Sequence, residues 1–457
     1  SYAVRKISCR KEGKNGIEVT ETEKKVRPAL VVAAVAFGIF VPLQMVSQTW
    51  DDHDRSGRYA CRDFGMNYLS SVDKDGIIFT SGDNDTFPLW YAQEVEGYRT
   101  DVRVVNMSYL ATDWYMAQMR RPAYESAPLP MQANAQSFAY DQHLFGLLYT
   151  YDVDGNPSFN NPNRQVSALT SIANYYSLPS AEGSGDTSFN YPNMFIPIDR
   201  AKIVANGVVP ADMRNNVDSN IPVNLLKDQY ITSKDGYTLS SAKAMQLDII
   251  SSMVAQGWKR PAYFAITIPD EYYSYFENQD SGYKFTTSAG MAYALTPINM
   301  LAYKSVGSVY TDKAYRNITE HYRWGGLDKA TPGNVPYYDE TAARMVNSTR
   351  ISIVEAAQNL IKEAEMATDL KEHNDSLKVD VPARVMTDGF IADRYNKART
   401  LLHLMEQKLP WFAVNASFSI IEDTASEYFS IAQASSNSED MKRGSQLMEQ
   451  LLVNYAQ

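Results

Sequence analysis

The chain has few cysteines and histidines, and it lacks an excess of positive charge. Its 457 residues include 2 cysteines, Cys9 and Cys61, and 5 histidines, so a disulfide scaffold and a cysteine-rich metal cluster are excluded. Acidic residues number 53 against 43 lysines and arginines, which gives a net charge of -10. Because a phosphate backbone is bound by clustered lysine and arginine, no nucleic-acid partner is expected.

Known catalytic motifs are also lacking. The sequence contains no GxSxG, HExxH, phosphate-binding loop or dinucleotide fingerprint in the required context. Residues 152–156 resemble the start of a calcium loop, but Pro157 and Asn163 stand where such a loop has glycine and glutamate. We therefore expect a turn there, and neither a bound cofactor nor a histidine-based catalytic triad.

One apolar run is long enough to cross a membrane. In residues 29–46 the one strongly polar residue is Gln44, and this length lies at the short end of a membrane span. Basic residues precede the run and acidic residues follow it, so residues 1–27 are expected in the cytoplasm. A buried core helix is the alternative. We predict a transmembrane helix over 28–47, with the remaining chain on the other side of the membrane.

A polar segment follows this run directly, and two interpretations of it remain open. It consists of Trp50, Asp51, Asp52, His53, Asp54 and Arg55. In the first interpretation its acidic groups lie near the bilayer surface, and Arg55 and Arg58 contact lipid headgroups. In the second, the carboxylates begin a helix and form ion pairs.

The middle of the chain has the pattern of an α/β domain, because short apolar runs alternate with helix-like segments. The predicted strands are 77–80, 102–106, 262–267 and an edge strand at 291–295. The predicted helices are 56–72 with Ser56 as N-cap, 86–96 ended by Gly97, one through Trp114, Met116 and Met119, and a strongly amphipathic one at 240–256. A parallel or mixed sheet with covering helices is expected over 48–310, interrupted by a long loop-built insertion at about 124–239.

The composition changes to helix-forming residues at Glu340, after an expected linker over 311–339. Helices are predicted over 340–367, 386–407, 418–433 and 438–455, with a mobile polar connection from Lys371 to Asp380. Four helices joined by short loops predict an all-α domain over 340–457. It would be a bundle or a helical-hairpin repeat of the tetratricopeptide type.

Polar and aromatic residues gather where the first two predicted strands end. The candidate binding residues are Asp83, Asn84, Asp85, Trp90, Asn106, Ser108 and Asp113. Because the carboxyl ends of neighbouring parallel strands meet at one edge of a sheet, these side chains are expected to converge.

Three roles are open for this cluster. Its oxygen atoms could hold a divalent cation such as Mg²⁺ or Ca²⁺, or they could bind sugar hydroxyls. In the third, structural role, Asp85 or Thr86 caps the following helix and Asp83 forms an Asx-turn. The residue types favour the structural role, and no metal site is assigned.

Several long ungapped motifs carry a resemblance to a known family. They are WDDHDRSGRY at 50–59, GDNDTFPLWYAQEVEG at 82–97, TDWY at 112–115 and WKRPAYF at 258–264. These motifs closely resemble the C-terminal part of a family of large bacterial membrane proteins, typical of Bacteroidota and formerly of unknown function. That family is similar to the eukaryotic transmembrane O-mannosyltransferases that modify plexin-type domains. The likeness covers residues 25 to 300 approximately.

The resemblance implies a polytopic glycosyltransferase with a lipid-linked sugar donor, of which this chain is the last inner-membrane helix and the periplasmic domain. Such an enzyme has its catalytic carboxylate in an early extracytoplasmic loop, outside this chain. The chain is therefore expected to be non-catalytic and to act as an accessory or acceptor-binding part. Its implied partners are the lipid bilayer, a protein acceptor or envelope protein and, for the parent enzyme, the lipid-linked sugar.

Two other functions remain open. The helical repeats could make the chain an envelope protein–protein interaction module. Alternatively, Asp83 and Asp85 could hold the metal of a hydrolase.

Overall fold

The computed structural model describes two compact units, Ser1–Arg58 and Tyr59–Gln457. The described residues are 21–53, 57–134, 137, 145–151, 157–158, 166–177, 186–188, 193–225, 232–233 and 236–455. Outside them lie Cys9 with the rest of 1–20, Asp54, Arg55, Ser56 and the calcium-loop-like segment 152–156.

The first unit contains one long helix, α2 (Glu21–His53). Its segment Pro28–Trp50 has a mean hydropathy of 2.3 and is apolar enough to span a membrane by length and composition. Its apolar side chains are exposed, and Phe37 is 72% exposed. The apolar helix predicted over 28–47 is thus confirmed, and it continues in both directions through polar residues.

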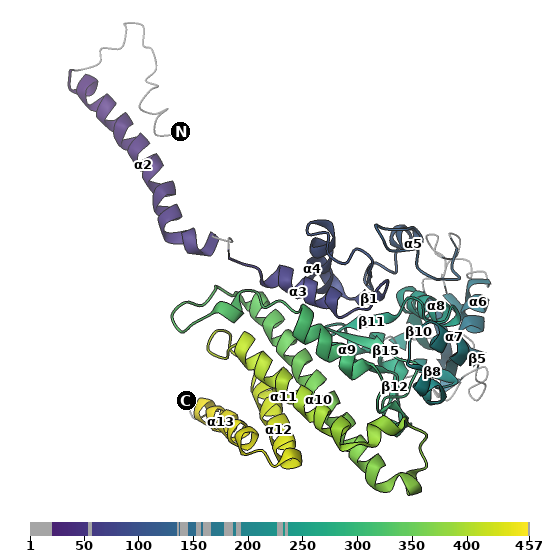
Figure 1. Ribbon diagram of the computed structural model, residues 1–457. Coiled ribbons are helices and arrows are strands. Elements are labelled where there is room, and N and C mark those ends of the chain that lie inside the picture. Colours follow the sequence, from purple (N-terminus) through teal and green to yellow (C-terminus); the bar gives the residue numbers. More distant parts are fainter. Residues whose placement is uncertain are drawn as a thin grey trace. The chain divides into compact units, whose positions relative to one another are not determined.

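The second unit is built on a mixed five-stranded sheet, in the order β14-β15-β11-β1-β2 (Figure 1). Its strands are β1 (Ile77–Thr80), β2 (Arg103–Asn106), β11 (Ala262–Ala265), β14 (Thr286–Ser288) and β15 (Ala292–Leu295). Strand β1 pairs in parallel with β2 and β11, whereas β15 runs antiparallel to β11 and β14. The predicted α/β sheet is confirmed. The prediction that 291–295 is an edge strand is wrong, because β15 has β14 on its outer side. The sequence did not indicate β14, since the polar run Thr286–Ser288 has no apolar signal.

Helices cover this sheet. They are α3 (Ala60–Ser70), α4 (Gly82–Glu94), α5 (Asp113–Met119), α8 (Ser241–Ala255) and α9 (Tyr310–Arg316). The expectation that α8 is amphipathic is wrong, since its residues are buried from Ala242 to Val254. Its polar side chains bind other segments instead of water: Asp248, for example, accepts hydrogen bonds from the backbone N–H groups of Gln132 and Ala133 at 2.9 Å.

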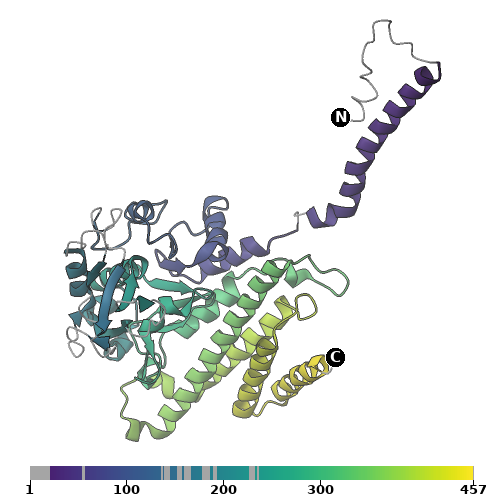
Figure 2. The ribbon, with the colours of Figure 1, turned by 180° about the vertical axis from the view of Figure 1, so that it is seen from behind.

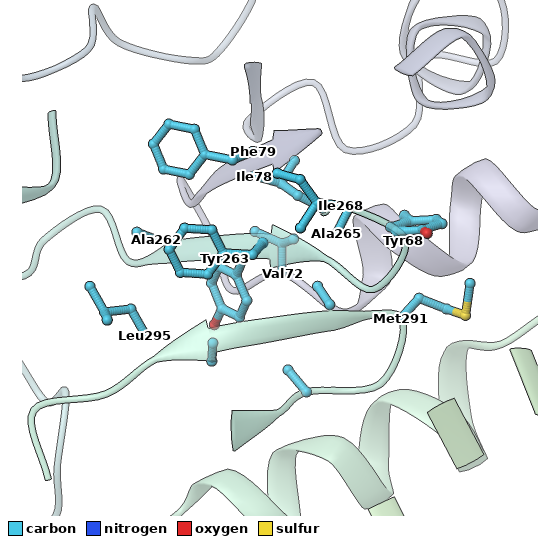
Figure 3. Close-up of a cluster of buried hydrophobic side chains, with 14 of the residues drawn as sticks. Tyr68, Val72, Ile78, Phe79, Ala262, Tyr263, Ala265, Ile268, Met291 and Leu295 are labelled. Atoms are coloured by element: carbon cyan, nitrogen blue, oxygen red, sulfur yellow. The ribbon is translucent and has the colours of Figure 1, made fainter. Parts of the chain in front are cut away.

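The core lies on both sides of β1 and β11. Figure 3 shows Ile78 and Phe79 of β1 near Tyr263 of β11, and Tyr68 of α3 near Ile268 and Met291. All of these side chains are almost fully buried, as expected for short apolar strands covered on both faces. Helix α4 approaches α3 at Gly65, where a Cβ atom would lie 2.3 Å from the carbonyl oxygen of Pro88. The absence of a side chain at Gly65 thus lets α4 pack closely against α3.

The described parts of the insertion include strands and helices. It contains the strands β3 (Phe145–Tyr151), β4 (Pro157–Ser158), β5 (Val166–Ser167), β6 (Asp186–Ser188), β7 (Asn193–Pro197), β8 (Asn220–Asn224), β9 (Thr232–Ser233) and β10 (Gly236–Ser240), and the helices α6 (Ala168–Ser177) and α7 (Arg200–Ala205). These strands form two further sheets, of which β5-β7-β8 is one. The loop prediction is wrong for these residues, because all the strands except β3 are five residues or shorter and several, such as β7 and β8, contain Asn and Pro.

The four predicted C-terminal helices are confirmed as α10 (Glu340–Leu377), α11 (Asp388–Lys408), α12 (Phe418–Ser435) and α13 (Ser438–Tyr455). In Figures 1 and 2, α10 packs beside α11, and α12 beside α13. The expected connection Lys371–Asp380 is helical through Leu377, since its polar residues are also good helix formers. One apolar core continues from the sheet into these helices. The segment 311–339, the expected linker, includes most of helix α9.

Candidate functional site

The turn from β1 into α4 is closed by a buried hydrogen-bond network. Gly82 has a left-handed φ of 73°, which lets the chain turn directly into the helix. The hydroxyl of Thr86 donates to the carbonyl oxygen of Gly82 at 2.7 Å and accepts from the side-chain amide of Asn106 at 2.8 Å. The other side-chain atom of Asn106, Oδ1, accepts from the backbone N–H of Ser108 at 2.8 Å. Asn106 is fully buried and therefore joins two strand ends instead of facing a ligand.

Asp85 is also turned into the protein. Burial raises the pKa of its carboxyl group, while hydrogen bonds from the Thr267 side chain and the Ser81 backbone lower it. The expectation that Asp85 or Thr86 caps the helix is wrong, because α4 begins at Gly82 with Ser81 in the N-cap position. Asp85 instead links the first turn of α4 to the segment after β11.

The remaining candidate residues lie at the surface. Asp83, Asn84, Ser108 and Asp113 are exposed, and the ring of Trp90 is partly exposed. The predicted neighbouring strands do bring the two segments together, since Thr80 of β1 is paired with Asn106 of β2. The cluster is therefore divided into a buried part, which shapes the turn, and an exposed part, which can contact a ligand.

A row of aromatic rings accompanies the exposed part. We call Phe87, Trp90, Tyr109 and Trp114 the aromatic row; successive ring centroids are 5.5, 6.3 and 5.8 Å apart. The first two ring pairs are almost parallel, at 24° and 15°. Phe87 is 46% and Trp114 is 51% exposed. Sequence reasoning selected Trp90 alone, although the nearby TFPLWY and TDWY motifs contain two of the other three rings.

A pocket adjoins the row at the β2 edge of the sheet. Its volume is about 380 Å³, and Trp90 contributes to both features. Other lining residues are Gln93, Arg103, Tyr115, Arg121 and Tyr124. Aromatic faces beside a mainly apolar pocket with a few polar groups can accommodate a ligand that has both an apolar face and hydrogen-bonding groups.

The divalent-cation hypothesis finds no support in this geometry. Within the described part of the chain, no three histidine, cysteine or acidic side chains form a group that could hold a metal ion. Asp83 is exposed, whereas Asp85 is buried and already hydrogen-bonded. The hydrolase hypothesis, which places a cation on Asp83 or Asp85, gains no support, because neither carboxylate belongs to such a group within the described residues.

A comparison with known protein families shows to which family the chain belongs. The model of a family described as TMEM260-associated domain 2 matches residues 61–313, which is more than half of the 457 residues. The chain belongs to this family. The match links it to the TMEM260 proteins, which are related to O-mannosyltransferases. No curated protein and no solved structure matches the chain.

The TMEM260-associated domain contains the motif at 258–264, and the structure gives this motif an architectural role. Arg260 donates to the carbonyl oxygens of Ala127 and Pro128 at 2.6 and 2.9 Å, and to that of Asp75 at 2.9 Å. Burial and the nearby positive charge of Arg103 together lower the pKa of Arg260 to about 10. The guanidinium group thus links the segment at Ala127 and Pro128, which leads into the insertion, to the turn at Asp75 before β1.

The membrane-proximal candidates lie outside the TMEM260-associated domain match. Trp50 is exposed, and Asp51, Asp52 and His53 are the last residues of α2. The interpretation that these carboxylates begin a helix is wrong for Asp51 and Asp52, because α2 runs through them. Asp54 and Arg55 belong to the part of the chain that is not described.

Proposed function

We propose that this chain is a membrane-anchored, non-catalytic part of a glycosyltransferase with a lipid-linked sugar donor, and that the aromatic row binds the acceptor. The observation that carries the proposal is the aromatic row at the carboxyl ends of β1 and β2, in which Phe87 and Trp114 are exposed. Ligands of α/β sheets bind at such strand ends. Membership of an O-mannosyltransferase-related family supports a glycosylated or sugar-accepting ligand.

The chemistry of the row suits a sugar or a glycosylated peptide. A sugar ring has an apolar C–H face that packs on the electron-rich face of an aromatic ring. Its hydroxyl groups need hydrogen-bond partners, and the exposed side chains of Asp83, Asn84, Ser108 and Asp113 are near the ends of the same strands. No bond-making step is assigned to these residues, since the proposed role is to hold the acceptor.

Helix α2 would anchor this part in the inner membrane. Its segment Pro28–Trp50 has the required length and apolar character. Basic residues precede it and Asp51 and Asp52 follow it, which favours a cytoplasmic N-terminal side and a periplasmic TMEM260-associated domain. This orientation would put the aromatic row on the side where a polyprenyl-linked donor delivers its sugar.

The proposal is tested in membrane vesicles that contain the full-length gene product, its endogenous protein acceptors and a labelled sugar donor. The double variant Trp90→Ala/Trp114→Ala should lower the initial rate of label transfer to protein about tenfold, which corresponds to about 1.4 kcal/mol. Tyr91→Ala is the matched control, because this exposed ring is on the same helix but outside the row. Equal rates for the double variant and the control would contradict the proposal.

A further inference from the structure

A second pocket lies at the opposite edge of the sheet, where β14 and β15 face helix α10. Its volume is about 240 Å³, below the range of about 300–1,000 Å³ that is usual for sites of drug-sized ligands. The residues that carry the argument are Tyr273, Lys284, Tyr293, Ser308 and Glu355. They come from five separate segments, which explains why the sequence alone did not indicate the site.

Glu355 has an unused acceptor in this pocket. Its Oε1 accepts a hydrogen bond from the hydroxyl of Tyr293 at 3.0 Å. Its Oε2 is buried and has no hydrogen-bond partner among the described residues. Burial raises the pKa of this carboxyl group, and the hydrogen bond from Tyr293 and the charge of Lys284 offset this only in part. A buried acceptor without a donor costs about 1–3 kcal/mol, so a ligand that supplies a donor would be stabilised here.

Ser308 is a second group without a partner. Its side chain lines the same pocket and is 2% exposed, and its Oγ makes no hydrogen bond within the described part of the chain. Most buried polar groups in proteins are hydrogen-bonded. An unpaired hydroxyl and an unpaired carboxylate oxygen in one pocket therefore call for a ligand with more than one hydrogen-bonding group.

The charges of the lining residues favour a neutral ligand. Lys284 pairs with Glu277 at 3.8 Å, and Glu363 pairs with Arg394 at 3.4 Å. The lysines on the lining disfavour a cation, while the carboxylates disfavour an anion. Hydroxyl groups from Thr286, Thr287 and Ser288 complete a lining that is rich in hydrogen-bonding groups and carries charges of both signs, three carboxylates and two lysines.

Two tyrosine rings form an aromatic wall. The ring centroids of Tyr273 and Tyr293 are 5.4 Å apart, and the rings are tilted by 42°. Burial and neighbouring carboxylates raise the pKa of Tyr273 to about 12, so its hydroxyl group keeps its proton and can act as a donor. An apolar ligand face can pack on these rings while its polar edge meets Glu355.

We propose that this pocket binds one neutral sugar ring, with one ring hydroxyl donating to Oε2 of Glu355 and another hydrogen-bonded to Ser308. The C–H face of the sugar packs against Tyr273. The pocket volume fits a single ring instead of an oligosaccharide chain. The site shares no residue with the aromatic row, and it goes beyond the function proposed above because it does not require that the row bind an acceptor.

The test is calorimetric titration of the full chain in detergent micelles with the methyl glycosides of mannose, glucose, galactose and N-acetylglucosamine. At least one glycoside should bind, and Glu355→Gln and Ser308→Ala should each weaken it about tenfold, or about 1.4 kcal/mol. Glu355→Gln should not lower the melting temperature, since it removes the charge of a carboxylate that is already short of a donor.

Glu365→Gln is the matched control, because the same chemical change is made on the same helix at an exposed position outside the pocket. It should leave glycoside affinity unchanged. The proposal is overturned if no glycoside binds with a Kd below about 10 mM. Equal affinity in wild type and Glu355→Gln, or binding of ethylammonium in place of glycosides, would overturn it as well. The aromatic-row variants should bind glycosides as the wild type does, even where they lose sugar transfer. Either proposal can therefore be contradicted without the other.

Discussion

The side-chain amide of Asn106 donates a hydrogen bond to the hydroxyl of Thr86 over 2.8 Å, and this contact joins the end of β2 to the N-terminal part of α4. Its other side-chain atom, Oδ1, accepts from the backbone N–H of Tyr109, a member of the aromatic row, at 3.2 Å. Asn106 thus holds Tyr109 in position relative to α4, which carries Phe87 and Trp90. The buried hydrogen bonds therefore fix the arrangement of the aromatic row at the surface.

Asn106→Ala should destabilise the protein by about 1–3 kcal/mol, because buried donors and acceptors at the strand ends lose their partners. The free energy of unfolding is measured by urea denaturation. Asn84→Ala is the control at an exposed asparagine of the same turn, and its effect should stay within about 0.5 kcal/mol. If both variants unfold at the same urea concentration, the network does not have the structural role described here.

Arg260→Met should loosen the segment that leads into the insertion. The substitution removes donors to the carbonyl oxygens of Asp75, Ala127 and Pro128 while it keeps the apolar stem of the side chain. Hydrogen–deuterium exchange should become faster at 121–130 and remain unchanged in α12. Lys259→Met, at the exposed neighbouring position, should not alter exchange in either region. Unchanged protection at 121–130 in Arg260→Met would contradict the role of this guanidinium group.

The ion pairs between α9 and α11 predict a pH dependence of stability. Burial raises the pKa of Asp312, but hydrogen bonds from Arg394 and Lys397 outweigh burial and hold it below its usual 3.8. A carboxylate with a lowered folded-state pKa stabilises the fold above its usual pKa, and this contribution is lost as the pH falls through the lowered value. The pair contacts are 2.6 Å to Arg394 and 2.7 Å to Lys397.

Asp312→Asn should therefore lower the urea midpoint at pH 7, and its difference from wild type should shrink as the pH falls below about 4. Asp328→Asn, at an exposed position, should follow the wild-type curve throughout. A difference between Asp312→Asn and wild type that is constant from pH 7 to pH 3 would show that the charge of Asp312 is not the cause.

The parts of the fold that could be predicted are those with local signals. The apolar run at 77–80 matches β1, because a strand buried on both faces needs apolar side chains at successive positions. Helix α13 occupies 438–455 as predicted, since helix formers and apolar spacing agree there. Helix α4 begins before its expected start because Gly82 makes the turn through backbone conformation, which leaves no capping pattern to detect.

The parts that could not be predicted depend on contacts between distant segments. Trp90 of α4 and Tyr109 after β2 become neighbours only through the pairing of the two strands. Whether a carboxylate faces water is also a tertiary property, as the different surroundings of Asp83 and Asp85 show. The pocket around Glu355 depends in the same way on the docking of α10 against β14 and β15.

The central claim is that the aromatic row binds the acceptor, and the dependence of transfer rate on acceptor concentration tests it most directly. The acceptor protein is purified from cells that lack the enzyme and is titrated into vesicles with wild-type full-length protein, Trp90→Ala/Trp114→Ala or Tyr91→Ala. The account predicts that the double variant raises KM about tenfold while kcat stays within about twofold of wild type, since only acceptor binding is weakened. An unchanged KM in the double variant, with Tyr91→Ala also unchanged, would contradict the account.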